Sequence, residues 1–200
     1  ITFTLGEISG MMIIGHASPI AQEMMMMTPA AAAGIVSLLA IANTTGKIGW
    51  GMISDRIGRY PVVILLLIFG GLAMVGLALF KSYFLFTAFI IIIGLCYGGF
   101  LSVMAPITAD LFGSRNLPVN YGVMFLSVAI AAYVGPYLAA VVKEAENGIY
   151  THAFVIAALL NLVGIVVFGI FMFMRQGKIS ISITSTNLNK NTSYANRKAI

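Results

Sequence analysis

The most informative absence in this sequence is charge. Only 8% of its 200 residues are Asp, Glu, Lys or Arg, whereas 60% are hydrophobic. A soluble domain carries about 25% charged residues, because charged side chains cover the surface that contacts water. The composition therefore indicates that lipid surrounds most of this chain, and it argues against a soluble enzyme.

Residues that carry enzymatic or metal chemistry are also scarce. The one cysteine, Cys96, lies inside an apolar run, so it can form no intrachain disulfide or multi-cysteine metal site. We find no Ser/His/Asp set, phosphate-binding loop or cluster of metal ligands. The net charge is +5, but the Lys and Arg residues stand at the ends of apolar runs rather than in a basic stripe. We expect no enzyme activity, cofactor, metal or nucleic-acid partner.

What the chain does contain is a series of long apolar runs. A membrane helix needs about 20 mainly apolar residues, whereas a membrane strand needs only about 10 and alternates in polarity. The sequence therefore predicts an all-α, polytopic protein in the lipid bilayer. Its six helices are expected over residues 1–22, 29–53, 61–80, 83–108, 118–142 and 149–174.

The short loops differ in Lys and Arg content, which predicts the orientation in the membrane. One set of loops holds Arg56 and Arg59, then Arg115, then residues 175 and 178, whereas the other holds only Lys81 and Lys143. The first set should face the cytoplasm, together with the carboxyl terminus. Residues 179–200 are rich in Ser, Thr, Asn and Lys, and we expect a disordered cytoplasmic tail.

The most specific motif lies between the second and third expected helices. It reads Gly51-Met-Ile-Ser-Asp55-Arg56-Ile-Gly58-Arg59 and resembles the G-x-x-x-D-R-x-G-R signature of the major facilitator superfamily. In that family the signature occupies this same loop of each six-helix half. Tyr60 is a mild departure, because a basic residue often follows the final arginine there.

The chemistry of this motif favours a gate between helices. Asp55 can meet the positive amino-terminal end of a neighbouring helix, and Arg56 and Arg59 can bridge to carboxylates or carbonyl oxygens. Such links can hold one cytoplasm-closed state and break in another. Asp110 and Arg115 flank the loop after the fourth helix and are expected to cap or bridge helices there. The alternative is that the motif arginines only set the topology.

Within this superfamily the chain resembles the oxalate/formate antiporter branch most. The resemblance rests on residues 15–22 (GHASPIAQ), on 43–59, and on 97–122 with its Thr-Ala-Asp-Leu-Phe-Gly-Ser-Arg-Asn run. It implies that residues 1–178 are the carboxyl-terminal half of a twelve-helix transporter, with two inverted three-helix repeats. Since the chain begins at Ile1 inside an apolar stretch, we expect a fragment that lacks its amino-terminal partner half.

The same resemblance bears on the substrate. Oxalate-carrying members of the branch place basic residues on the eighth and eleventh helices. These positions fall on Lys47, in place of an arginine, and on Val128, which is uncharged. This argues against oxalate and leaves a monocarboxylate or another small anion.

Lys47 is the basic residue placed well inside an expected span, about 12 Å from Asp55 along the helix. Asn43 and Thr44 lie one turn before it, so we expect it to face the bundle interior. A buried ammonium needs a partner, which a carboxylate substrate would supply. The alternative is a lysine that snorkels to the cytoplasmic headgroups.

Three further polar residues are candidates for transport. His16 could carry a proton or donate to substrate, although a single histidine on an apolar helix is often structural. Glu7 should lie on the opposite face of that helix, near the cytoplasmic mouth, paired or hydrated, with a possible role in proton coupling. Tyr97, beside Gly98, could contact substrate or simply pack.

These observations predict alternating-access transport of a small organic anion, by antiport or proton-coupled symport. Two alternatives stay open. One is a proton-coupled symporter of a neutral solute, in which Lys47 is structural and His16 or Glu7 carries the proton. The other is a receptor or scaffold derived from a half-transporter.

Overall fold

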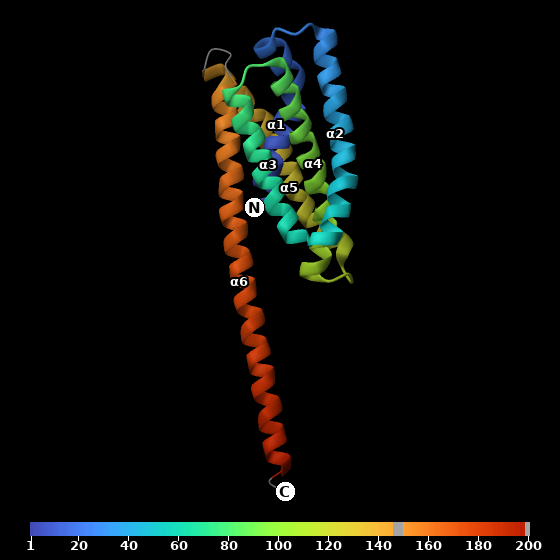
Figure 1. The fold of residues 1–200 in the computed structure, drawn as a ribbon, viewed down its shortest axis with the longest axis vertical. Coiled ribbons are helices and arrows are strands. Elements are labelled where there is room, and N and C mark those ends of the chain that lie inside the picture. Colours follow the sequence, from blue (N-terminus) through green and yellow to red (C-terminus); the bar gives the residue numbers. More distant parts are fainter. Residues whose placement is uncertain (146–149, 199–200) are drawn as a thin grey trace. The chain divides into compact units, whose positions relative to one another are not determined.

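The computed structural model describes the backbone of residues 1–145 and 150–198, and side chains up to Met174. This part of the chain is helical and contains no strand. Within residues 1–165, successive helices run in alternating directions (Figure 1). Their bounds are α1 Thr2–Met25, α2 Pro29–Ile57, α3 Arg59–Leu79, α4 Tyr83–Phe112, α5 Leu117–Ala145 and α6 Thr151–Lys198. Residues 1–165 form one compact unit and residues 166–200 a second.

The expected helices are all present, and several extend beyond the apolar run that predicted them. Five of them, α2 to α5 and the Thr151–Met174 part of α6, are long and apolar enough to cross a membrane. Helix α1 is not one of these five. Its polar side chains include Glu7, His16 and Glu23.

The end of the chain also differs from the sequence-based expectation. Residues 179–200 were expected to be disordered, whereas the α6 backbone continues as a helix to Lys198. No glycine or proline follows Gly177, so nothing in the local sequence ends the helix there. Residues 199–200, and the side chains after Met174, lie outside the described part of the chain. The cytoplasmic placement of this end stays a prediction.

Helix α4 is central to the packing of residues 1–165, because it contacts α1, α2, α3 and α5, while α1 also packs along α5. Glycine permits the closest approaches. A side chain at Gly46 would overlap the backbone of Leu95, and one at Gly98 would overlap the backbone of Asn43. Small residues at helix contacts allow such approaches in membranes, where lipid is as apolar as the side chains. The α2–α4 contact therefore fixes the backbone around Lys47.

Candidate functional site

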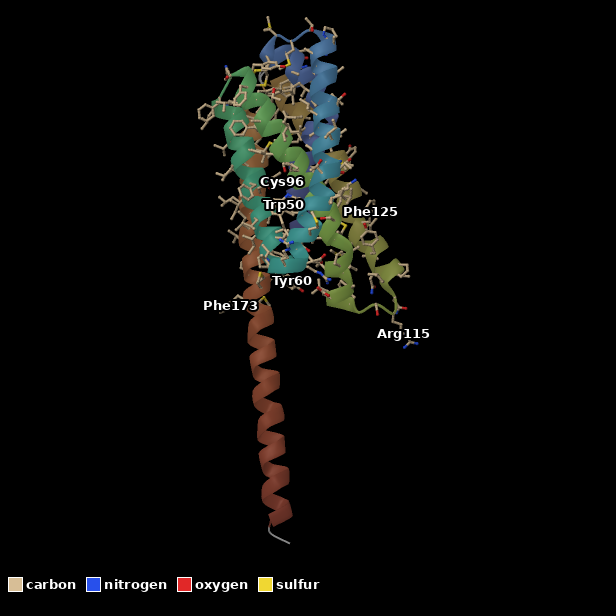
Figure 2. All side chains as sticks on the ribbon, turned by 45° about the vertical axis from the view of Figure 1, so that its right-hand side comes forward. Trp50, Tyr60, Cys96, Arg115, Phe125 and Phe173 are labelled. Carbon is tan, nitrogen blue, oxygen red and sulfur yellow. The ribbon has the colours of Figure 1, made fainter. Side chains whose placement is uncertain are left out.

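The signature motif forms a sharp turn between α2 and α3. Gly58 alone separates the two helices, with φ of 93°, a backbone conformation that favours glycine. Its N–H donates to the Ser54 carbonyl oxygen at 3.0 Å, which closes the end of α2. Arg59 consequently occupies the first turn of α3, beside the end of α4. Tyr60 and Arg115 lie toward the same end of the bundle (Figure 2).

Arg59 links α3 to α4 at this motif end. Its guanidinium forms an ion pair with the Asp110 carboxylate, and the same Nη1 donates to the Pro106 carbonyl oxygen at 2.9 Å. The two charged side chains are 30% and 41% exposed, so water still reaches the pair. A contact of this kind can hold two helix ends together and can open without exposing a fully buried charge.

The remaining motif residues are placed differently. Asp55, Arg56 and Arg115 are exposed, and they take part in neither ion pair of the described residues. Gly51 lies within α2, where an added side chain would meet nothing within 4 Å. Packing among the described residues therefore gives no reason for glycine at this position.

Lys47 lies at the edge of the α2–α4 contact. Its backbone nitrogen is among the atoms nearest to Gly98, while its side chain is exposed. Its side chain does not enter the core of the described helices, because Ala42 and Gly46, not Lys47, belong to the buried stripe of α2. Asn43, one turn earlier, is half-buried, and its Oδ1 is buried without a hydrogen-bond partner. Lys47 and Asn43 thus lie one turn apart on the same side of α2.

The structure also shows where Val128 and Tyr97, two further residues singled out in the sequence, lie. Val128 is buried on α5 with 6% of its surface exposed, so an apolar side chain stands where the resemblance placed a lysine. Tyr97 is 7% exposed, packs on Gly10 and donates from its hydroxyl to Met11 Sδ at 3.6 Å. Tyr97 therefore faces α1, whereas the next residue, Gly98, faces Lys47 on α2.

Glu7 is fully buried. Its exposed fraction is 0%, and neither carboxylate oxygen has a hydrogen-bond partner in the described part of the chain. Within the described residues the carboxyl is therefore neither paired nor exposed to water, contrary to expectation, while its place near the cytoplasmic mouth stays a prediction. The sequence showed a charge near the start of an apolar run, but not that α4 and α5 pack closely on α1 at the neighbouring residues.

His16 belongs to a polar cavity at the other end of α1. The cavity has a volume of about 480 Å³ and is lined in part by His16, Glu23, Lys143 and Tyr150. Lys143 Nζ lies 2.7 Å from Glu23 Oε1 and 5.3 Å from the centre of the Tyr150 ring, which is itself 6.2 Å from the imidazole of His16. Burial raises the pKa of the Tyr150 phenol. Sequence reasoning missed this cluster, because Glu23 and Lys143 are 120 residues apart.

The structure thus distributes the sequence-predicted residues over three places. Arg59 and Asp110 meet at the motif end, and His16 lies in the cavity at the opposite end. Lys47, Asn43, Tyr97 and Glu7 lie on the three helices that meet around residues 97 and 98 of α4. No group of three or more His, Cys, Asp or Glu side chains that could hold a metal ion occurs among the described residues.

Comparison with known proteins identifies the family of this chain. The family model described as the Major Facilitator Superfamily matches residues 3–192. The uncharacterized MFS-type transporter YhjX of Escherichia coli is 31% identical over 134 residues, which cover 66% of this chain and 33% of that protein.

Two further relatives have named substrates. The oxalate:formate antiporter of Oxalobacter formigenes is 27% identical over 174 residues, covering 84% of this chain and 40% of the relative. Human monocarboxylate transporter 10 is 27% identical over 133 residues, covering 65% and 26%. The matched part of the chain thus spans well under half the length of each of these relatives.

Proposed function

Because this chain belongs to the major facilitator superfamily, we propose that it forms part of a carrier for a small organic anion, with Lys47 as the cation that binds the anion. The family supports membrane transport rather than enzymatic chemistry. The substrate class rests on the local chemistry of α2, where a carboxylate would meet the ammonium of Lys47 and the polar side chain of Asn43.

The position of Lys47 is the observation that carries this proposal. Among the Lys and Arg residues whose side chains the structure describes, it is the one that lies more than two helical turns from either end of its helix. It is about 15 Å from the last residue of α2 at 1.5 Å per residue. A charge at such depth is costly in hydrocarbon and typically marks an ion or substrate pathway. The exposed side chain leaves room for an anion beside it.

The chemistry of the site favours a monocarboxylate over a dicarboxylate. Lysine is a compact point charge, whereas arginine offers a planar fork that holds a carboxylate through two hydrogen bonds. A second carboxylate would require a second cation, and the buried Val128 supplies none. Relatives named as monocarboxylate transporters and as an oxalate:formate antiporter support a small carboxylate as the substrate class.

We further propose that a second six-helix half completes the site and that the Arg59–Asp110 pair closes the cytoplasmic side. Substrate sites of this superfamily lie at the interface between repeats near the membrane midplane. Lys47 is exposed on the bundle described here, as a residue at such an interface would be. Rocking of the two halves would then expose the site to each side in turn.

The test is uptake by the full-length protein in proteoliposomes. Labelled formate, acetate, lactate and oxalate are offered in turn, with protein-free liposomes as the control for passive entry of the undissociated acids. We expect saturable uptake of monocarboxylates and weak uptake of oxalate. Well-folded protein that takes up none of the four would rule out this substrate class, and uptake of a neutral solute instead would identify the alternative symporter.

A further inference from the structure

Glu7 lies on a stretch of α1 that makes two close helix contacts. On one side, side chains at Gly6 and Gly10 would overlap the rings of Phe100 and Tyr97, so α1 lies directly on α4. On the other side, Gly135 of α5 approaches the α1 backbone at Ile8 and Met12. Glu7 stands between these two contacts in the sequence and is 0% exposed.

Aromatic packing seals the start of α1 beside this carboxyl. The rings of Phe3 and Phe100 meet edge to face, with their centres 6.1 Å apart. Phe3 precedes Glu7 by one helical turn and Met11 follows it by one turn, where the sulfur accepts the Tyr97 hydroxyl. One turn before and one turn after Glu7, α1 therefore carries an aromatic ring and a thioether, which offer an anion little compensation.

The titratable groups on the neighbouring helices leave Glu7 without a counter-charge. On α4, Tyr97 interacts electrostatically with Glu7, while Cys96 is a buried thiol and Asp110 binds Arg59 of α3. On α5, Tyr133 and Tyr137 are 72% and 58% exposed and stack on each other.

The titratable groups of α2, α3 and α1 also supply no counter-charge to Glu7. Lys47 of α2 is exposed, and Tyr60 lies at the start of α3. Within α1, His16 is more than two turns away, in the cavity with Glu23, and the Ser9 hydroxyl donates to the Gly6 carbonyl oxygen at 2.8 Å. No ion pair of the described residues includes Glu7.

A carboxylate in such surroundings takes up a proton rather than remain ionised, because an isolated buried charge loses its hydration without compensation. We propose that Glu7 is the proton-binding site of this carrier, protonated while α1 lies on α4 and α5 and deprotonated when these helices separate. The inference rests on the proposed transport function. Each cycle would bring one proton from water to the Glu7 carboxylate and release it to water on the other side, with one monocarboxylate bound at Lys47.

Helix α4 provides the connection between the two sites. Tyr97 contacts α1 one turn from Glu7, and its neighbour Gly98 contacts the backbone of Lys47 and Asn43. A shift of α4 on binding of the anion would therefore change the contact between α4 and α1 beside Glu7. Symport of one proton with one monoanion moves no net charge, so the cycle would be electroneutral.

The first experiment compares two transport modes of the full-length protein. Glu7→Gln mimics the protonated carboxyl, so we expect it to keep exchange of labelled for unlabelled carboxylate. It should lose accumulation driven by a pH gradient, which for one coupled proton is about tenfold per pH unit. The matched control is Glu144→Gln, an exposed carboxylate in neither ion pair of the described residues, which should keep both. A Glu7→Gln protein that still accumulates substrate in a pH gradient would overturn the proposal.

A second measurement does not depend on the substrate. Infrared difference spectra of wild type and Glu7→Gln at neutral pH should contain the carbonyl stretch of a protonated carboxylic acid that only wild type has. The absence of this band would overturn the proton site even if transport proceeds. A band in a protein that takes up no carboxylate would reject the proposed substrate and keep the proton site. Accumulation driven by a sodium gradient instead would reject the proton as coupling ion.

Discussion

Arg59 on the first turn of α3 binds Asp110 near the end of α4, and its Nη1 also donates to the Pro106 carbonyl oxygen. These contacts tie two helix ends together at the motif end of the bundle. They involve the last arginine of the signature, while Asp55 and Arg56 stay exposed. The geometry thus singles out one arginine of the motif as the helix-bridging one.

Loss of this bridge should alter transport more than folding. An exposed ion pair contributes about 0–1 kcal/mol to stability, so Arg59→Ala and Asp110→Asn should unfold close to the wild-type temperature. Both variants should slow uptake, because each removes the Arg59–Asp110 contact of the closed state. Since both lose the same contact, the double variant should be no slower than the worse single variant. Arg115→Ala, another exposed arginine in neither ion pair, is the control. Additive losses in the double variant would show that the two residues act separately.

The close contact of α2 with α4 should be sensitive to a single methyl group. At Gly46 an added side chain would overlap the Leu95 backbone, whereas at Gly49, in the same helix, it would meet nothing within 4 Å. Overpacking costs about 1–3 kcal/mol, and alanine favours a helix over glycine. We therefore expect Gly46→Ala to lower the melting temperature in detergent and Gly49→Ala to keep or raise it. Equal effects of the two changes would contradict this packing.

The sequence predicted the helices well because their apolar runs are long. The predicted helix boundaries fell short, because hydropathy marks only the part of a helix that lies in hydrocarbon. The helix expected to end at residue 53 continues to Ile57. Composition also failed at the polar residues after 178, where the backbone stays helical to Lys198. Period and length identify helices, but they do not determine where each helix ends.

The site could be predicted only in part, because local patterns do not show which residues from distant helices come together. Arg59 was identified by its motif, but its partner atoms on α4 were not. Glu7 was expected to be paired or hydrated, and its burial follows only from the contacts that Gly6, Gly10 and Gly135 allow. The Glu23–Lys143 pair left no signal in the sequence.

The predicted orientation can be measured with single cysteines. Cys96 is the one cysteine of this chain and is buried, so Cys96→Ala supplies a background without reactive thiols in this half. Arg115→Cys should react with a membrane-impermeant maleimide only from the cytoplasmic side, and Glu144→Cys only from the opposite side, as the Lys and Arg distribution predicts. Permeabilised membranes serve as the control for reactivity. The reverse labelling pattern would invert the assignment of the motif end.

The most direct test of the account is monocarboxylate uptake by full-length Lys47→Ala and Lys47→Arg beside wild type, with the exposed loop change Lys81→Ala as control. We expect Lys47→Ala to lose saturable uptake while retaining its folded elution profile, because the anion loses its cation. Lys47→Arg should retain uptake with an altered KM, since the charge remains in a different geometry. Uptake by Lys47→Ala equal to that of wild type would contradict the account and make Lys47 a structural lysine.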